Sequence, residues 1–292
     1  MVFLERTSSK RLRLKKHHIG FGILLLYIIA CQSCMMMRTT PKETRQFFAS
    51  SKVAFTDKTV LVDGYSIHYI ETGESRQPTL LFVHGSPGSW DAFKRYLTDS
   101  LLLSKYRMIA VDRPGFGYSG FGTAANLPIQ TKILGAFMQQ VGYDNSITLI
   151  GHSLGGTAIV QMAAEDPDRY DHIVVLAGSV DPKAETSELW RPIIKTKPLR
   201  YLIPGALRPS NDELWLLKSD LFVLQPLLKN ITCGVTIIHG TKDQLVPYSN
   251  VAFMEKEFKN AKSIDIIAIE NANHFIPWEH FGLIRDQLYK LK

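Results

Sequence analysis

The chain has 292 residues, of which 45% are hydrophobic and 21% are charged, and its formal net charge at pH 7 is +7. This length and composition fit a folded globular protein with a sizeable core and exclude a mainly disordered chain. Most of the positive charge lies in residues 1–18, so the body of the chain offers no basic face or motif for nucleic acid, and no nucleic-acid partner is expected.

The N-terminus predicts export. After the basic stretch, residues 19–30 carry no charged side chain, and Cys31 follows them directly. Such a run is short for a membrane-spanning helix, which needs about 20 apolar residues, but it fits the apolar core of a secretory signal. The sequence Ile28-Ile29-Ala30-Cys31 resembles the lipobox of bacterial lipoproteins, in which the cysteine is acylated and becomes the first residue of the mature protein.

This resemblance implies a lipoprotein-type signal peptide over residues 1–30 and a lipid anchor on Cys31. It also implies a membrane-associated, extracytoplasmic location. In a Gram-negative cell, Gln32 does not resemble the aspartate that signals retention in the inner membrane, which favours the outer membrane. An uncleaved signal anchor over residues 19–30 is the alternative.

Residues 31–54, polar with an apolar start and a proline, predict a tether between this anchor and the folded domain at 55–292. The remaining cysteines, Cys34 and Cys233, are too few for a disulfide framework. They are interpreted as structural residues.

From Phe55 onward, strand-like and helix-like segments alternate. The pair Asp63-Gly64 favours the positive dihedral angles of a two-residue turn and predicts a hairpin around it. The later strand-like runs are TLLFVHG, YRMIAVD, ITLIGHS, HIVVLAG, VTIIHG and SIDIIAIE, and the helix-like segments include residues 125–141, 154–165 and 250–258. Nearly continuous apolar strands that alternate with helices indicate an α/β fold, with a mostly parallel central sheet flanked by helices.

Ser153 stands directly after one of these apolar runs and before a helix-like segment. The sequence Gly151-His152-Ser153-Leu154-Gly155 has the spacing of the G-x-S-x-G nucleophile elbow, whose glycines avoid clashes in a sharp strand-to-helix turn. A serine hydroxyl also needs a base to remove its proton and a third group to orient that base. Asp243 and His274 each follow a later strand-like run and supply these two groups.

Together with HGSPGS (84–89), VDRPGFGYS (111–119), GTKDQLVP (240–247) and NHFIPWE (273–279), these residues resemble the α/β-hydrolase fold family in its serine esterase-like branch. The resemblance implies that Ser153 attacks a carbonyl carbon, that His274 takes and returns the proton, and that Asp243 fixes the imidazole. It further implies an oxyanion hole formed by the backbone N–H groups of Ser86 and Leu154.

Some members of this family place the acid after an earlier strand, where this chain has Asp181, so Asp181 is the alternative to Asp243. Epoxide hydrolases and haloalkane dehalogenases of the family have aspartate at the elbow, which disfavours those activities here. Asp112 and Arg113 are interpreted as turn and packing residues. The sequence holds no metal-ligand cluster or phosphate-binding loop, and no cofactor or metal is expected.

An insert at about 183–230 predicts a small, partly helical lid over the serine. Ser210 to Glu213 have the pattern of a capping box, and a leucine stripe follows at helical spacing. The stripe consists of Leu214, Leu217, Leu221, Leu224 and Leu228. A lid rich in leucine and tryptophan, the latter at Trp190, indicates a substrate with an apolar acyl or alcohol group.

The sequence therefore predicts a serine hydrolase that cleaves a small apolar carboxylic ester, thioester or lactone through an acyl-enzyme. Two alternatives stay open. One is an acyltransferase or a cyanohydrin-cleaving lyase on the same scaffold. The other is a catalytically idle, membrane-tethered binding protein.

Overall fold

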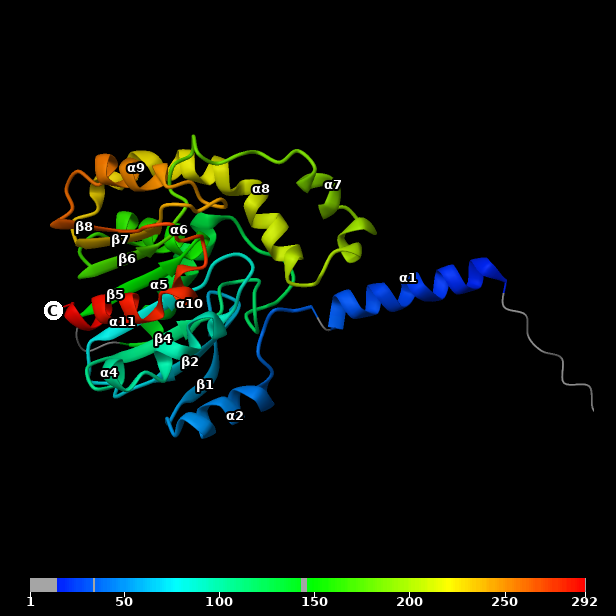
Figure 1. Cartoon of the computed structure of the whole chain (residues 1–292), viewed down its shortest axis with the longest axis horizontal. Coiled ribbons are helices and arrows are strands. Elements are labelled where there is room, and N and C mark those ends of the chain that lie inside the picture. The colour runs from blue at the N-terminus through cyan, green and yellow to red at the C-terminus, as the bar shows by residue number, and fades with distance from the viewer. Residues whose placement is uncertain (1–14, 34, 143–145, 292) are drawn as a thin grey trace, which may run out of the picture.

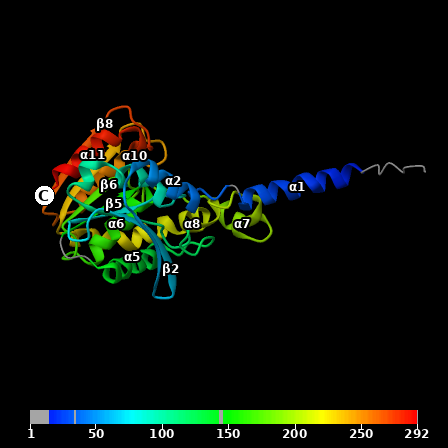
Figure 2. The same cartoon turned by 90° about the horizontal axis from the view of Figure 1, so that it is seen from below.

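The computed structural model describes residues 15–33, 35–142 and 146–291. The basic part of the leader within residues 1–14, Cys34 and Lys292 lie outside these residues. The body of the described chain is built around one sheet, and the N-terminal helix extends away from that body (Figures 1 and 2).

The sheet has eight strands in the order β1-β2-β4-β3-β5-β6-β7-β8. Strand β2 pairs antiparallel with both β1 and β4, and the pairs from β4 through β8 are parallel. The strands are β1 (Thr56–Val62), β2 (Tyr65–Thr72), β3 (Thr79–Val83), β4 (Arg107–Val111), β5 (Ile147–His152), β6 (His172–Leu176), β7 (Gly234–Gly240) and β8 (Ser263–Ile269). This confirms the predicted α/β class with a mostly parallel central sheet.

Helices cover both faces of the sheet. The α-helices are α1 (Lys16–Ser33), α2 (Pro41–Ser51), α3 (Lys94–Leu97), α4 (Ser100–Leu103), α5 (Leu127–Val141), α6 (Leu154–Glu165), α7 (Arg191–Lys195), α8 (Leu207–Leu224), α9 (Ser249–Glu257), α10 (Ile276–Glu279) and α11 (Phe281–Lys290). The 3-10 helices are η1 (Trp90–Phe93), η2 (Leu199–Leu202) and η3 (Gln225–Asn230). Alternate strand residues enter two separate cores. Leu81 and Val83 pack with α5, α6 and α8, whereas Leu80 and Phe82 pack with η1, α3 and α11.

The central strands are buried because helices cover both faces of the sheet. Every residue of β3, β4, β5 and β7 is buried, which is why these strands are nearly continuous apolar runs in the sequence. The hairpin between β1 and β2 turns at Asp63 and Gly64, whose φ angles are 48° and 84°, so the predicted turn is confirmed.

The structure differs from the tether predicted for residues 31–54, because this segment contains helix α2. Thr40 caps α2 by accepting from the backbone N–H of Glu43, and the Glu43 carboxylate accepts from the backbone N–H of Thr40. Phe48, a residue of α2 itself, is buried and stacks on Phe55, with 4.2 Å between ring centroids. The segment therefore packs on the domain.

The lid begins with the short helices α7 and η2 and continues into α8. The predicted capping box at Ser210–Glu213 is wrong, because α8 starts at Leu207 and these residues are buried inside it. Their side chains bind remote partners instead of capping the helix: the Ser86 hydroxyl donates to Ser210, and Glu213 accepts from Arg113. The leucine stripe is confirmed as a packing face at Leu217, Leu221 and Leu224, which enter the core beside α5 and α6.

Among the described residues, the hydrogen bonds between helix α1 and the body come from the C-terminal half of the helix. The Tyr27 hydroxyl donates to the carbonyl oxygen of Leu202 at 2.8 Å, and the backbone N–H of Gly205 donates to the carbonyl oxygen of Cys31 at 2.8 Å. Both partners belong to the lid. Among the described residues, no helix combines the length and apolar character needed to cross a membrane.

Candidate active site

Ser153 sits in a strained turn between β5 and α6. Its φ and ψ are 55° and −125°, outside the ordinary regions for a residue with a side chain, and such strain costs about 1–3 kcal/mol. A side chain at Gly151 would collide with the Gly155 carbonyl oxygen, and one at Gly155 would collide with the carbonyl oxygen of Val83. The two glycines of the elbow are therefore required by close backbone packing, and the turn holds Ser153 at the carboxyl end of β5.

His274 and Asp243 meet beside this turn. The loop after β8 carries His274, the loop after β7 carries Asp243, and Nδ1 of His274 lies 2.7 Å from Oδ2 of Asp243. Both side chains are buried. The other oxygen of Asp243, Oδ1, accepts from the backbone N–H groups of Leu245 and Val246 at 2.9 and 2.8 Å. The carboxylate is thus fixed on both sides and directs the imidazole.

Asp243 is held in its charged form. Burial alone would raise the pKa of this carboxyl, but hydrogen bonds from His239, His274 and the Val246 N–H outweigh that effect and lower the pKa well below its ordinary value. A carboxylate beside Nδ1 accepts a hydrogen bond from the N–H at that position, so Nε2 is the imidazole nitrogen left to act as a base.

Asp181, the alternative acid, lies elsewhere. Its Oδ1 accepts from the backbone N–H of Lys183 at 2.8 Å, and its own N–H donates to Asn250. It therefore closes a local turn after β6. Of the two acids suggested by the sequence, Asp243 is the one that the fold brings to His274.

His152 packs against His274, the candidate base. Its Nε2 lies 3.0 Å from the carbonyl oxygen of His274, and the two rings are 4.7 Å apart. Burial, together with the neighbouring His274, lowers the pKa of His152 to about 3. His152 is thus a neutral packing residue at ordinary pH.

The loop after β3 faces the elbow. Ser86 and Leu154 line the same pocket as Ser153 and His274. Leu154 opens α6, so its N–H has no partner within the helix. A Cβ at Gly85 would lie only 3.0 Å from the Ser153 Cβ, so the missing side chain lets this loop approach the nucleophile. Ser86 and Leu154, the two residues predicted to form the oxyanion hole, thus line one pocket.

A fully buried arginine supports this loop. Arg113 donates from Nε to the carbonyl oxygen of His84 at 2.9 Å and from an Nη atom to that of Gly85 at 2.9 Å. Its two Nη atoms also bind both carboxylate oxygens of Glu213 on α8, at 2.7 and 2.9 Å, and Gln130 completes the cluster. Charge-assisted bidentate pairs of this kind are strong and directional. Arg113 therefore connects the loop of the site to the lid.

Sequence reasoning missed this pair because its members are far apart. Local sequence predicts a turn and packing residue at Arg113 and part of a helix cap at Glu213, whereas the two residues form a buried ion pair across 100 positions of sequence. A buried arginine without a partner would be costly, so VDRPG next to a strand end was the available signal for a distant acid.

The pocket over Ser153 has a volume of about 1310 Å³, above the usual range of about 300–1,000 Å³ for ligand sites. It extends from the elbow to Met37 and Arg38 in the N-terminal segment and to Thr186 and Arg191 in the lid. Its apolar wall includes Leu214, Leu217, Phe275 and Trp278. Trp190 is absent from the lining and half exposed, so the lid presents this tryptophan to the outside.

In the part of the chain that the structure describes, no group of His, Cys, Asp or Glu side chains is arranged to hold a metal ion.

Comparison with known proteins supports a hydrolase. A family model described as the alpha/beta hydrolase fold matches residues 78–202. The uncharacterised hydrolase YugF of Bacillus subtilis is 29% identical over 263 residues, which cover 78% of this chain and 94% of YugF. Epoxide hydrolase 3 of Xenopus tropicalis is 31% identical over 116 residues, but these cover only 39% of this chain and 31% of that protein. The chain thus spans about a third of the length of this relative.

The same fold is found among solved structures. A bacterial membrane phospholipase A superposes with a TM-score of 0.62 and 19% sequence identity, over 95% of this chain and all of that one. Identity at this level establishes a shared fold only.

We predict that the pair between Arg113 and Glu213 is a major source of stability. Glu213→Ala should lower the free energy of unfolding by about 3–5 kcal/mol, because it leaves a buried guanidinium without its counterion. Asp286→Ala is the matched control, since Asp286 pairs with Arg285 at the surface and its loss should change stability little. Urea unfolding followed by circular dichroism measures both. Equal effects would contradict the special role of the buried pair.

Proposed function

Because the chain has the α/β-hydrolase fold, we propose that it is a serine hydrolase that cleaves a carboxylic ester, thioester or lactone through an acyl-enzyme. The observation that carries this proposal is the position of Ser153: it lies on a strained elbow in a large pocket that His274 also lines, and Asp243 binds His274 from behind. Nucleophile, base and orienting acid thus come from the ends of three strands of one sheet.

In the proposed reaction, Oγ of Ser153 attacks the carbonyl carbon while Nε2 of His274 takes the hydroxyl proton. The imidazolium that forms is stabilised by the charged carboxylate of Asp243. The tetrahedral intermediate then breaks its bond to the alcohol or thiol, which leaves with the proton from His274. Water, activated by the same imidazole, attacks the acyl-enzyme, releases the carboxylic acid and restores Ser153.

The developing oxyanion would be held by the backbone N–H groups of Ser86 and Leu154, which border the pocket. Arg113 fixes the carbonyl groups of His84 and Gly85 just before Ser86. We infer that this support keeps the loop in place as charge develops, since the oxyanion donors act without reorganising.

The residue at position 153 also separates this proposal from the epoxide hydrolases among the relatives. That group resembles this chain over part of its length but is expected to carry aspartate at the elbow, where this chain has serine. An acyltransferase or a lyase would use the same residues. Reactions with water as the only acceptor, compared with reactions that contain an added alcohol or a cyanohydrin, distinguish these three activities by their products.

The pocket supports a substrate with an apolar acyl or alcohol group. Leucine and aromatic side chains form much of its wall, and its volume leaves room for a long chain. A panel of p-nitrophenyl esters of increasing chain length measures this preference directly.

We predict that Ser153→Ala abolishes covalent labelling by a fluorophosphonate probe and lowers ester turnover by about 10⁴-fold or more. The reason is that alanine removes the hydroxyl oxygen that stands on the strained elbow and would carry the acyl group. Circular dichroism serves as the control for an intact fold. A variant that retains labelling or full turnover would contradict the assignment, and an unlabelled wild type would favour the idle binding protein.

The two candidate acids give a second prediction. Asp243→Asn should lower kcat by orders of magnitude, because an amide neither orients the correct imidazole tautomer nor stabilises the imidazolium. Asp181→Asn should leave kcat nearly unchanged, since its carboxylate binds only a local backbone N–H. Steady-state kinetics on one p-nitrophenyl ester compares the variants. The reverse order of losses would assign the acid to Asp181.

We also propose that the chain works at an extracytoplasmic membrane face, as the leader predicts. Lipidated Cys31 and an uncleaved leader are the two means of attachment that the sequence suggests. Contacts within the described residues support the uncleaved leader. Cys31 is buried, its carbonyl oxygen accepts from the backbone N–H of Gly205 in the lid, and the Tyr27 hydroxyl donates to the carbonyl oxygen of Leu202. Cleavage ahead of Cys31 would remove Tyr27 and most of α1.

We therefore predict that the mature protein in the membrane fraction retains the residues before Cys31. Mass spectrometry of the intact protein should find the leader present. Cys31→Ser should change the mass only by the substitution itself and should leave the protein in the membrane fraction. A mature chain that begins at acylated Cys31 would instead establish the lipoprotein. Recovery of the wild type wholly in the soluble fraction would contradict the membrane location.

A further inference from the structure

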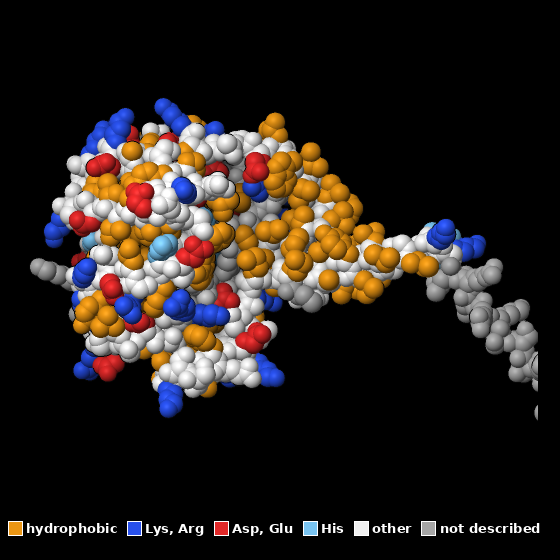
Figure 3. All heavy atoms as spheres, viewed as in Figure 1, with side chains coloured by type: hydrophobic (Ala, Val, Ile, Leu, Met, Phe, Trp, Pro, Cys, Tyr) orange, Lys and Arg blue, Asp and Glu red, His pale blue; other side chains and the backbone are white. Residues whose placement is uncertain are grey.

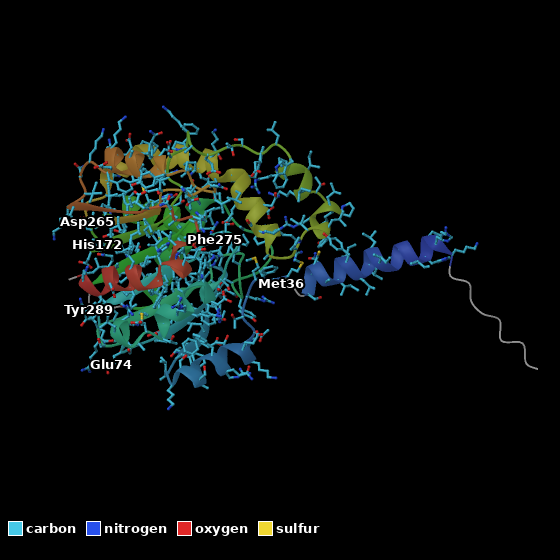
Figure 4. The ribbon with its side chains drawn as sticks, in the orientation of Figure 1. Met36, Glu74, His172, Asp265, Phe275 and Tyr289 are labelled. Atoms are coloured by element: carbon cyan, nitrogen blue, oxygen red, sulfur yellow. The ribbon has the colours of Figure 1, made fainter. Side chains whose placement is uncertain are left out.

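A large apolar surface joins α1 to the lid. We call it the apolar cap. On α1 it consists of Ile19, Phe21, Ile23, Leu24, Leu25, Leu26, Tyr27 and Ile29, and on the lid of Leu189, Trp190, Ile193, Tyr201 and Leu207, all of which are exposed. Figure 3 shows hydrophobic side chains gathered over the α7 region and along α1. The two parts meet where α1 contacts η2, near Met36 at the junction with the body (Figure 4).

The described residues leave most of this surface uncovered. Consecutive residues from Ile23 to Tyr27 are each about half exposed or more, so apolar side chains surround α1 rather than forming one stripe. A helix that is apolar on all sides is stable only in apolar surroundings. Soluble proteins rarely expose contiguous apolar patches beyond a few hundred Å² unless the patch binds something. The cap therefore needs an occupant.

Charge at one end of the cap identifies that occupant as lipid. Lys15, Lys16, His17 and His18 precede the apolar run, and residues 1–18 as a whole hold six basic side chains and one acidic one. Basic residues beside an apolar segment are attracted to anionic headgroups. In a parallel pair formed with a second copy of the chain, the same residues would repel each other.

The aromatic residues of the cap point to the same occupant. Tyr27, Trp190 and Tyr201 are partly exposed and combine an apolar ring with a polar group, as is typical at the boundary between headgroups and acyl chains. The run from Ile19 to Ala30 covers roughly 18 Å as a helix, less than the hydrocarbon thickness of about 30 Å. Since one leaflet is about half of that thickness, the helix fits within one leaflet when it is tilted or lies along the interface.

The lining of the pocket reaches segments next to both parts of the cap. Met37, four residues after the end of α1, is exposed and lines the pocket, and Thr186 lines it from the lid side next to α7. The cavity thus runs from Ser153 to surfaces that border both parts of the cap. A bilayer that covered the cap would meet the opening of the pocket.

We propose that the apolar cap docks into one leaflet of an anionic bilayer and that the ester substrate enters the pocket from that leaflet. The docking surface rests on retention of α1, and the entry of substrate rests also on the proposed hydrolase activity. The substrate class that follows is an acyl ester embedded in a membrane, because such an ester already lies at the level of the pocket opening.

Vesicle flotation tests the docking without catalysis. The full chain carrying Ser153→Ala is mixed with vesicles of equimolar phosphatidylcholine and phosphatidylglycerol. A lid variant, Leu189→Glu with Ile193→Glu, should lower the partition coefficient by about tenfold or more, because two apolar side chains no longer enter the leaflet. The control is Leu61→Glu, a residue 66% exposed on the β1–β2 hairpin, which should leave partition unchanged.

Activity tests the entry of substrate. With Ser153 restored, the lid variant should hydrolyse a soluble acetyl ester as the wild type does, because neither changed residue lines the pocket. On a long-chain ester embedded in the same vesicles, its apparent KM should rise by about the factor lost in partition, while kcat is retained.

Flotation of the lid variant equal to that of the Leu61→Glu control would overturn the proposal. A wild type that forms a dimer without binding vesicles, and whose dimer the lid variant dissociates, would overturn it in favour of a second copy of the chain. A mature chain that lacks α1 would overturn it as well. If flotation behaves as expected but no ester is hydrolysed, the docking surface stands and only the hydrolase proposal fails.

Discussion

The buried ion pair between Arg113 and Glu213 is the interaction on which the site depends most widely. One guanidinium binds the carbonyl groups of the loop before Ser86, the carboxylate of the lid helix α8 and the amide of Gln130 on α5. Neither charge has access to solvent, so each is stable there only because the other is present. The position of the lid and the conformation of the loop therefore depend on the same ion pair. Loss of the pair would disturb both.

The strained turn at Ser153 imposes the second constraint. The strain energy of the Ser153 backbone is small compared with the packing energy of the two elements that hold the turn. All of β5 is buried, and α6 is buried along nearly its full length. The glycines at positions 151 and 155 allow the strand, the helix and the loop after β3 to approach closely enough to share one pocket. A serine that is exposed only in part and cannot relax its backbone is suited to attack in a fixed direction.

Much of this was predictable from sequence, and the failures have a common cause. Buried parallel strands leave apolar runs, tight turns leave Asp-Gly, and the elbow leaves its glycines, so local sequence predicted the sheet, the hairpin and the position of Ser153. The role of Ser210 and Glu213 was misread because their partners, Ser86 and Arg113, are remote in sequence and a buried acid resembles a helix cap when read locally. Helix α2 did leave a local signal, because Thr40, Pro41 and Glu43 have the pattern of a capped helix start, whereas its packing on the domain depends on contacts of Phe48 with the remote Phe55 and Trp90. The direction of Trp190, away from the pocket, had no local signal at all.

The lid is held on two sides, and this decides how a substrate can reach Ser153. On its inner side Glu213 binds Arg113, and Asp212 binds Arg200 from η2, so that α8 and the start of the lid are tied to each other and to the core. On its outer side the carbonyl group of Cys31 accepts from Gly205, and Gln32 donates to the carbonyl oxygen of Tyr201.

To open the lid, the chain would have to break a buried ion pair and also separate α1 from η2. The pocket already reaches the surface at Met37 and Thr186 without either change. Entry through this existing opening is therefore the less costly route, and one edge of that opening, Met37, lies only four residues beyond the end of α1.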